Sequence, residues 1–335
     1  MKVVEMRSPY LIFIGSESRK TYAKTGAGLV QWRPELCRGQ MRLAADALDL
    51  GLADMTLEEA ASAGVRSLVI GTATVGGDIP EQWYPVLRQA LGLGMDLVAG
   101  AHKRLADVPG LAELAAANGA RLIDVRVPPA ALPVGSGAKR RGKRLLMVGT
   151  DCAVGKKYSA LCVERDMRAA GMKADFRATG QTGIMIAGCG VPMDAVVSDF
   201  LSGAAEILSP DNDADHWDVI EGQGGLFHPG YSSVSTGLLI GSQPDAFVVC
   251  HEAGRERISG WEDFPLPSIE DVIARTIELG VLVNPAIHCV GVCVNTSALP
   301  APEREHYLAE LGQRLNLPCV DPLIDGTLAI VDRLR

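Results

Sequence analysis

The stretch Leu145-Leu-Met-Val-Gly149-Thr-Asp-Cys-Ala-Val-Gly155-Lys156-Lys157-Tyr158 decides the fold class of this chain. It runs from an apolar strand through a loop bounded by two glycines to a lysine and a helix, which is the context of a phosphate-binding loop. Glycines let backbone N–H groups converge on an oxyanion, and the helix N-terminus and Lys156 add positive charge. The stretch therefore predicts an α/β domain with a phosphate loop; the alternative is a tight strand-to-helix turn with incidental lysines.

Strand and helix signals alternate on both sides of this stretch, which indicates parallel sheets with right-handed crossovers. Apolar runs predict strands at 67–71, 95–99, 121–125, 145–148, 219–220, 246–250 and 289–294, and helical spacing covers 81–93, 109–118, 156–170 and 269–277. Proline, glycine and basic residues interrupt the pattern between the halves. We therefore predict a Rossmann-like parallel-sheet domain over 1–127, a basic Pro/Gly linker over 128–143 and a P-loop parallel-sheet domain over 144–335.

The composition excludes several classes of protein. A chain of 335 residues with a hydrophobic fraction of 47% suggests two well-cored domains. With 32 Lys and Arg against 40 Asp and Glu, the net charge of −8 argues against binding to nucleic acid or an anionic membrane. The sequence has no long apolar run, no signal-peptide pattern and no zinc-type cysteine spacing. We expect a cytoplasmic protein without a bound metal.

Four segments resemble the dethiobiotin-synthetase-like branch of P-loop proteins. They are Gly149–Lys157, Thr179–Gly183, Glu221–Gly225 and Val290–Asn295, and their order and spacing agree with that family from about 144 to 335. In that family the last segment ends in an Asn that contacts the adenine edge. The resemblance implies that the cofactor is bound by Gly149, Thr150, Cys152, Ala153, Val154, Gly155, Lys156, Lys157, Tyr158 and Asn295.

The phosphate loop departs from that family at two points. The usual pattern has four residues between its glycines and Ser or Thr after the lysine, whereas here there are five, and Lys157 follows. A protonated lysine cannot ligate the Mg²⁺ that this Ser or Thr holds. A second cation instead suits an adenine nucleotide with extra phosphate, such as coenzyme A, whose charge the arginines of the linker could also neutralise.

The whole chain resembles a bacterial family known as a domain of unknown function. The segments that carry this resemblance are Ile70–Gly77, Gly149–Tyr158, Arg177–Gly183 and Glu221–Gly230. Members of that family have been assigned as D-glutamate N-acetyltransferases, which use acetyl-CoA in D-amino-acid catabolism. The resemblance thus implies acetyl-CoA as cosubstrate and an acidic D-amino acid as acceptor. The glycine run after Ile70 is not a GxGxxG fingerprint, which disfavours an NAD site.

Acetyl transfer to an amine needs a base, oxyanion donors and a held acceptor. Glu221 is the leading candidate for the base or ammonium partner because it follows a buried strand at the edge where such sheets bind ligands; a purely structural carboxylate is the alternative. His228 is the second candidate, on the same loop, and a hydrogen-bonded loop histidine is its alternative. Asp151, inside the phosphate loop, would repel phosphate and is expected to face a cation or an amine.

The acceptor-binding residues are predicted from the remaining polar positions of these loops. Arg177 is a candidate for clamping a carboxylate, and Arg255 and Arg257 are two more. The backbone N–H groups of Gly222, Gly224 and Gly225 are candidate oxyanion donors. The full set of predicted acceptor-binding residues is Arg177, Gln181, Thr182, Gly224, Gly225 and Arg255. A surface or sheet-capping salt bridge is the alternative for Arg177. Cys152 is a further candidate as an acyl-relay nucleophile, because lysines and a helix N-terminus lower the pKa of a thiol.

Three functions remain open from the sequence. The first is an N-acetyltransferase on an acidic D-amino acid, the second an ATP- and Mg²⁺-dependent ligase or kinase, and the third a nucleotide-responsive binding module. Lys157 counts against the second, and the several polar loops around one edge count against the third. A homodimer is the default expectation for the assembly, with a small-molecule amino acid as the binding partner.

Overall fold

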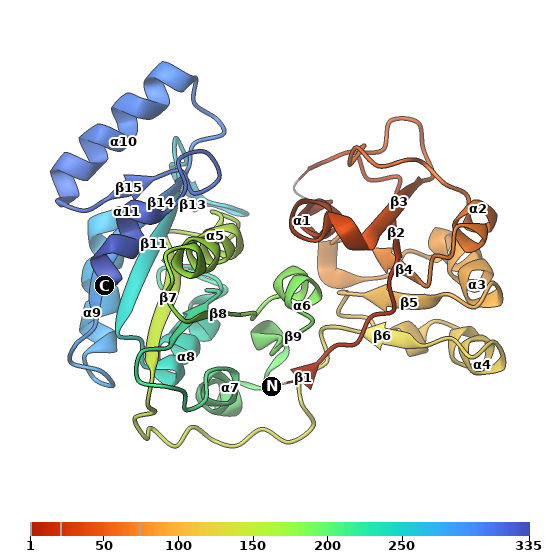
Figure 1. Ribbon diagram of the computed structural model, residues 1–335, viewed down its shortest axis with the longest axis horizontal. Helices are drawn as coiled ribbons and strands as arrows, with labels where there is room; N and C mark the ends of the chain where they lie inside the picture. Colours follow the sequence, from red (N-terminus) through yellow and green to blue (C-terminus); the bar gives the residue numbers. More distant parts are fainter. Residues whose placement is uncertain (1, 21, 74) are drawn as a thin grey trace. The chain divides into compact units, whose positions relative to one another are not determined.

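A computed structural model describes residues 2–20, 22–73 and 75–335 (Figure 1). The chain forms two compact units, each with its own parallel sheet. The N-terminal unit comprises 2–127 and 181–192, and the P-loop unit comprises 128–180 and 193–335. The expected fold class, a Rossmann-like parallel-sheet domain with a P-loop parallel-sheet domain, is confirmed.

The sheet of the N-terminal unit has five parallel strands. Their spatial order is β3 (Cys37–Arg42), β2 (Tyr10–Gly15), β4 (Ser67–Ile70), β5 (Asp96–Ala99) and β6 (Leu122–Asp124). This is the flavodoxin-like order, in which the chain changes direction of travel between β2 and β4. The predicted strands at β4, β5 and β6 are confirmed, whereas β2 and β3 were not predicted.

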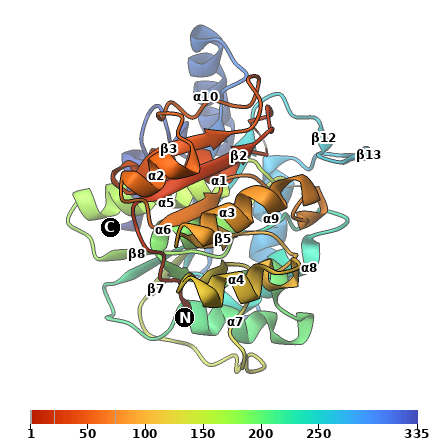
Figure 2. The ribbon, with the colours of Figure 1, turned by 90° about the vertical axis from the view of Figure 1, so that its right-hand side faces the viewer.

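Helices cover both faces of this sheet. Apolar side chains of α2 (Leu57–Ser62), α3 (Tyr84–Gly92) and α4 (Leu111–Ala117) join those of the strands in one buried core, and Figure 2 shows these helices alongside one another. Helix α1 (Lys24–Trp32) follows β2, and a right-handed crossover places it on the other face. The core keeps the carboxyl ends of the strands, and the loops that follow them, in fixed positions.

A short segment from the second half of the chain belongs to the N-terminal unit. Helix α6 (Gln181–Ala187) packs against α1, and the hydroxyls of Thr25 and Thr182 form a hydrogen bond of 3.0 Å. Strand β9 (Cys189–Gly190) pairs with β1 (Lys2–Val3). The predicted domain over 144–335 therefore differs from the compact unit, because residues 181–192 leave it.

The P-loop unit has a six-stranded parallel sheet. Its order is β15 (Cys319–Val320), β14 (His288–Asn295), β11 (Ala246–Glu252), β7 (Lys143–Gly149), β10 (Trp217–Ile220) and β8 (Ala174–Arg177). Strand β7 lies at the centre, so the loop that follows Gly149 opens between the ends of β10 and β11. This is where the strand order reverses, the edge at which open α/β sheets bind ligands.

The helices of the P-loop unit pack on both faces of its sheet (Figure 1). Helix α5 (Lys156–Ala169) contacts α11 (Leu328–Val331), while α8 (Ser232–Ser242) contacts α7 (Leu201–Leu208) and α9 (Ile269–Gly280). Ser268 caps α9 by accepting a hydrogen bond from the N–H of Asp271, as its spacing predicts. The outer edge carries α10 (Ala301–Leu315), and a two-stranded ribbon joins β12 (Arg257–Ile258) to β13 (Trp261–Pro265).

The basic linker has a structural role that the sequence did not predict. The guanidinium of Arg140 is buried and donates to the carbonyls of Ser209, Gly241 and Ser242, at the C-terminal ends of α7 and α8. Arg144, at the start of β7, donates to the carbonyls of its neighbours and to the hydroxyl of Ser209. Because Arg144 lies at the opposite end of β7 from Gly149, these arginines do not neutralise a ligand on the phosphate loop.

Within the described part of the chain, every helix is too short or too polar to cross a bilayer.

Candidate active site

The phosphate loop turns sharply between β7 and α5. Ala153 and Gly155 have φ angles of 56° and 104°, in the left-handed region, and they direct the chain into Lys156 at the start of the helix. The Lys156 side chain is buried, and Nζ donates to the carbonyl oxygens of Asp151 and Gly224, at 2.7 Å each. Burial lowers the pKa of Lys156. The lysine therefore ties the loop to the glycine turn that follows β10.

The other predicted cofactor residues lie along the same edge of the sheet. The Thr150 hydroxyl pairs with His251 Nδ1 at 3.2 Å, at the end of β11. Nζ of Lys157 lies 4.1 Å from the centre of the Tyr158 ring. The Asn295 side chain, at the end of β14, accepts a hydrogen bond from the N–H of Ser297. Strands β7, β11 and β14 are neighbours, so the sheet brings these predicted residues to one edge.

Asp151 is a fully buried carboxylate with three hydrogen-bond donors. One oxygen accepts from its neighbour, the N–H of Cys152, and the other accepts from Arg255 Nη1 and from the N–H of Ser259, both at 2.8 Å. Arg255 also donates to the carbonyl of Cys152 and pairs with Glu252. The expected cation opposite Asp151 is thus Arg255. The guanidinium of Arg255, which was predicted to clamp the acceptor, makes its hydrogen bonds with the phosphate loop.

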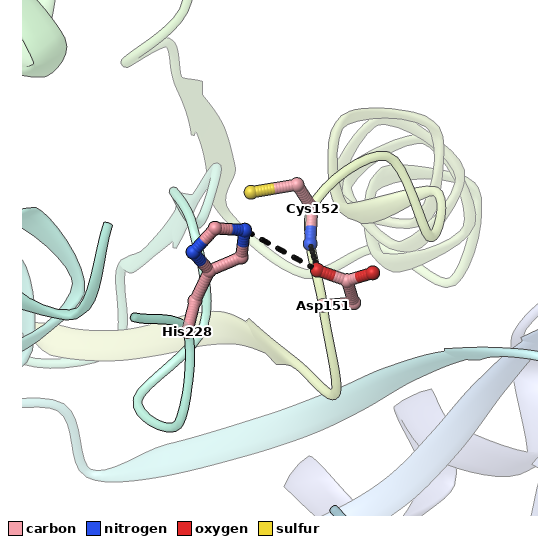
Figure 3. Close-up of side chains that lie close together, drawn as sticks. All are labelled: Asp151, Cys152 and His228. Atoms are coloured by element: carbon pink, nitrogen blue, oxygen red, sulfur yellow. Dashed lines mark hydrogen bonds and ion pairs between the residues drawn. The ribbon is translucent and has the colours of Figure 1, made fainter. Parts of the chain in front are cut away.

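His228 lies beside Asp151 (Figure 3), and one hydrogen bond and two aromatic contacts hold its ring. Nδ1 accepts a hydrogen bond from the N–H of Gly230 at 3.1 Å, and Nε2 lies 3.7 Å from an oxygen of Asp151. The rings of Tyr231 and Trp261 pack on it, with centroids 4.6 and 4.7 Å away. Burial lowers the pKa of His228, so the imidazole is neutral near pH 7.

Cys152 completes a cluster with these two residues. The closest ligand-type atoms of Asp151, Cys152 and His228 all lie within 4.8 Å of one another, and Figure 3 shows the three side chains converging. A carboxylate, a thiol and an imidazole at this spacing are groups that zinc accepts as ligands. Each oxygen of Asp151 is already hydrogen-bonded to an N–H group, which weakens it as a metal ligand. The cluster is therefore better suited to hydrogen bonding than to metal binding.

Glu221 links the end of β10 to the loop that follows β8. Its carboxylate is buried, and Oε2 accepts hydrogen bonds from the N–H groups of Thr179 and Gly180, at 2.9 and 3.0 Å. Burial raises the pKa of Glu221, although these hydrogen bonds and the two lysines Lys157 and Lys156 lower it. A raised pKa moves a carboxyl group toward the range in which it accepts protons at neutral pH, which suits a general base.

The remaining predicted acceptor residues fall into two places. Arg177 is buried and pairs with Asp218 at 2.7 Å, as the alternative reading of this arginine proposed. Gly224 has a φ angle of 53° and its carbonyl accepts from Lys156, while the carbonyl of Gly225 accepts from the N–H of His228. These three residues belong to the P-loop unit.

Gln181 and Thr182 lie in the other unit, on α6. The amide nitrogen of Gln181 donates to the carbonyl of Gly100 at 2.6 Å, and its amide oxygen accepts a hydrogen bond from Arg126 at 3.1 Å. The sequence analysis missed Arg126, as well as Ser259 and Trp261 around the Asp151 cluster. A basic residue directly after a predicted strand was the available signal for Arg126; the other two come from a ribbon that the sequence pattern did not indicate.

Comparisons with known proteins match both units. Residues 133–331 match the family described as "Domain of unknown function (DUF1611_C) P-loop domain", and residues 39–128 match "Domain of unknown function (DUF1611_N) Rossmann-like domain". In the solved crystal structure of a DUF1611 family protein from Anabaena variabilis ATCC 29413, the matched part covers 98% of this chain and 99% of that one. The TM-score is 0.89 at 31% identity.

Two curated relatives carry the same name. The "D-glutamate N-acetyltransferase" of Tritonibacter scottomollicae is 49% identical over 329 residues, which cover 98% of this chain and 99% of the relative. The protein of that name from a Pseudoalteromonas species is 44% identical over 331 residues, covering 99% and 100%. Both matches run through the two units and all the loops described above. The chain therefore belongs to the DUF1611 family and is an acyltransferase.

Proposed function

We propose that this acyltransferase moves the acetyl group of acetyl-CoA to the amine of D-glutamate, in the breakdown of D-amino acids. The observation that carries the proposal is the full-length similarity to two D-glutamate N-acetyltransferases, at 49% and 44% identity. Since the matches cover both units, they include whatever part each unit takes in binding donor and acceptor.

The charge of the phosphate loop supports coenzyme A as the carrier. Lys156 and the N-terminus of α5 offer positive charge to a pyrophosphate. Lys157 occupies the position at which an ATP- and Mg²⁺-dependent enzyme places a metal-binding hydroxyl. The loop therefore favours a phosphorylated ligand that needs no metal, and it disfavours the ligase or kinase alternative.

Two buried side chains support the transfer chemistry. The acceptor enters as an ammonium ion, and we assign Glu221 to take its proton, because burial raises the pKa of this carboxyl. The free amine then attacks the thioester carbonyl, a C–N bond forms, and negative charge develops on the carbonyl oxygen. His228, with a proton on Nε2, is assigned to donate a hydrogen bond to that oxygen. Collapse of the intermediate breaks the C–S bond. The thiolate of coenzyme A leaves and takes up the second proton of the amine nitrogen, and Glu221 releases the first proton to solvent.

An assay of acetyl transfer tests this proposal. Purified protein is incubated with acetyl-CoA and, separately, with D-glutamate, L-glutamate and D-aspartate, and release of the coenzyme A thiol is followed. We expect the fastest release with D-glutamate and an N-acetylated product of matching mass. Thiol release with none of these amino acids would contradict the proposal, and hydrolysis of ATP with Mg²⁺ in the same preparation would favour the ligase alternative.

We also infer a cytoplasmic location and a homodimer. Burial raises the pKa of Cys162, Cys250 and Cys289 to about 11 each, so these thiols are inert toward exchange, as suits a reducing compartment. Dimers are the commonest assembly of soluble enzymes. Sedimentation of the purified protein tests the dimer, and a mass of one chain would contradict it.

A further inference from the structure

The N-terminal unit has a pocket of its own at the carboxyl end of its sheet, which we call the edge pocket. Its lining comes from the segments that follow β4, β5 and β6 and from α6, and it includes Thr72, Asp78, Trp83, Gly100, Arg126 and Gln181. Its empty volume is about 300 Å³, part of it open to solvent. Open α/β sheets bind ligands at this edge, close to the point where the strand order reverses. Thr74, between Thr72 and Gly77, lies outside the described residues.

Two residues that line the edge pocket, Thr72 and Trp83, each carry a buried polar atom without a partner among the described residues. Thr72 and Trp83 are 7% and 4% exposed, and among the described residues neither Thr72 Oγ1 nor Trp83 Nε1 has a hydrogen-bond partner. A buried polar group without a partner destabilises the fold. An indole N–H can only donate, and a threonine hydroxyl can donate as well. Two such donors in one pocket indicate a ligand with acceptor atoms.

The charge of the pocket points in the same direction. Arg126, two residues after β6, brings a guanidinium group that donates to the amide oxygen of Gln181. The acidic side chain at the rim, Asp78, is offset by Lys103 at 3.1 Å. A guanidinium group with neutral donors beside it matches the planar, two-oxygen geometry of a carboxylate.

Glycine keeps the inner wall of the pocket open. At Gly100, after β5, an added Cβ would lie 1.6 Å from the amide end of Gln181. At Gly77, where φ is 69°, it would lie 2.5 Å from the His102 ring. Any side chain at Gly100 would therefore displace Gln181, whose amide oxygen is a hydrogen-bond partner of Arg126. The wall depends on these residues being small.

We propose that the edge pocket binds one carboxylate group of a small amino acid or dicarboxylate, with Arg126, Thr72 and Trp83 as donors. The proposal goes beyond the acetyl transfer argued above: Gln181 was predicted to contact the acceptor, but Arg126, Thr72 and Trp83 had no assigned role. Two kinds of molecule carry such a carboxylate: the acceptor D-glutamate, or a separate dicarboxylate that acts as an effector. Experiments on the full chain separate these sources.

Calorimetric titration without acetyl-CoA tests the pocket directly. The probes are D-glutamate and glutarate, which keeps both carboxylates but has no amine, so binding does not depend on turnover. We expect Arg126→Gln to weaken the binding of glutarate at least tenfold, and Thr72→Val or Trp83→Phe to weaken it about threefold. Arg104→Gln, an exposed arginine of the same unit, is the matched control and should bind as the wild type does.

The same titrations can overturn the proposal. It is wrong if the wild type binds neither probe, or if Arg126→Gln binds both unchanged. If Arg126→Gln fails to fold, as judged by circular dichroism, Thr72→Val decides, because valine has nearly the size of threonine, and Trp83→Phe, which keeps an aromatic ring but removes the indole N–H, supports it.

Kinetics then identify the source of the carboxylate. If the ligand is the acceptor, glutarate competes with D-glutamate, and Arg126→Gln raises KM for D-glutamate at least tenfold with KM for acetyl-CoA unchanged. If it is an effector, glutarate binds together with D-glutamate and KM for D-glutamate does not change. A wild type that binds glutarate but does not acetylate D-glutamate would disprove the proposed function and leave the edge pocket supported.

Discussion

Nε2 of His228 lies 3.7 Å from a carboxylate oxygen of Asp151, and both side chains are fully buried. The opposite ring nitrogen of His228 accepts a hydrogen bond from the N–H of Gly230. That bond assigns the proton of the neutral imidazole to Nε2, because an accepting nitrogen cannot carry it. His228 is therefore arranged as a hydrogen-bond donor and not as a proton acceptor.

The substitution His228→Phe should lower kcat about 10²-fold or more. The ring of phenylalanine keeps the packing against Tyr231 and Trp261 but removes the N–H, and loss of one oxyanion donor costs about that factor. Loss of the bond from Gly230 should cost only about 1 kcal/mol of unfolding free energy. Steady-state kinetics and thermal unfolding measure the two effects. Tyr231→Phe is the control, and a normal kcat in His228→Phe would remove the residue from the chemistry.

Much of the fold was predictable because buried parallel strands are continuous apolar runs. The strands after Ala246 and around Val219 stand out for that reason. The placement of α6 was not predictable, because its packing against α1 depends on contacts between segments 157 residues apart, such as Thr25 and Thr182. The spacing of residues along the chain carries no information on contacts between such distant segments.

The candidate site was predictable only in its backbone. The loop around Lys156 and the glycine turn after Glu221 follow from local patterns, since each is a strand end followed by glycines. The partners of the side chains do not follow. Arg255 was predicted to bind the acceptor, yet it lies against Asp151, 104 residues earlier in the chain. The arginines of the linker were considered as partners of phosphate, yet Arg140 binds the carbonyls at the ends of two helices that lie much later in the chain.

Lys156→Ala should raise KM for acetyl-CoA by a factor of about 10 to 150. One charged hydrogen bond contributes on the order of 1.5–3 kcal/mol, and each 1.4 kcal/mol is about tenfold in affinity. In the wild type, acetyl-CoA should also raise the melting temperature more than ATP with Mg²⁺ does. Lys157→Thr restores the usual residue of the loop and serves as the comparison. An unchanged KM in Lys156→Ala would exclude the loop as the donor site.

Acid should destabilise the protein between about pH 6.5 and pH 4 through His251. Burial, with Arg255 and Arg314 nearby, lowers the pKa of His251 from 6.5 to about 4. Within that window the unfolded chain binds a proton that the folded chain does not, so the free energy of unfolding decreases as the pH falls, by up to roughly 3 kcal/mol. Above pH 6.5, His251 is neutral in both the folded and the unfolded chain, so it no longer changes the free energy of unfolding with pH.

Chemical denaturation across this pH range measures the effect. His251→Asn should flatten the pH dependence, whereas His306→Asn, an exposed histidine on α10, should leave it as in the wild type. Equal slopes in wild type and His251→Asn would show that His251 does not titrate in this way.

Arg140→Met should lower the free energy of unfolding by on the order of 3 kcal/mol, because buried carbonyls at the ends of α7 and α8 lose their donor. Arg141→Met changes the exposed neighbour, whose side chain donates to the carbonyl of Asn212, and should cost less than about 1 kcal/mol. Denaturant titration compares the two variants. KM for acetyl-CoA should stay normal in Arg140→Met, and a raised KM with normal stability would restore the linker to the cofactor site.

Glu221→Gln should reduce turnover about 10²- to 10⁴-fold, as expected for removal of a general base. The amide keeps the size of the side chain, and its oxygen can still accept from Thr179 and Gly180, so the loop after β8 should stay in place. Because burial raises the pKa of Glu221, the base form becomes populated as the pH rises, and the wild-type rate should increase with pH through that raised pKa.

The Glu221→Gln variant should lose this increase and keep the wild-type KM for acetyl-CoA, which separates loss of the base from loss of donor binding. His228→Asn is the companion variant, since it changes the other candidate on the same loop. If Glu221→Gln keeps its turnover while His228→Asn loses both turnover and the pH-dependent increase, the two roles must be exchanged. If both variants keep their turnover, Asp151 becomes the next carboxylate to test, by Asp151→Asn, since it shares the cluster with His228.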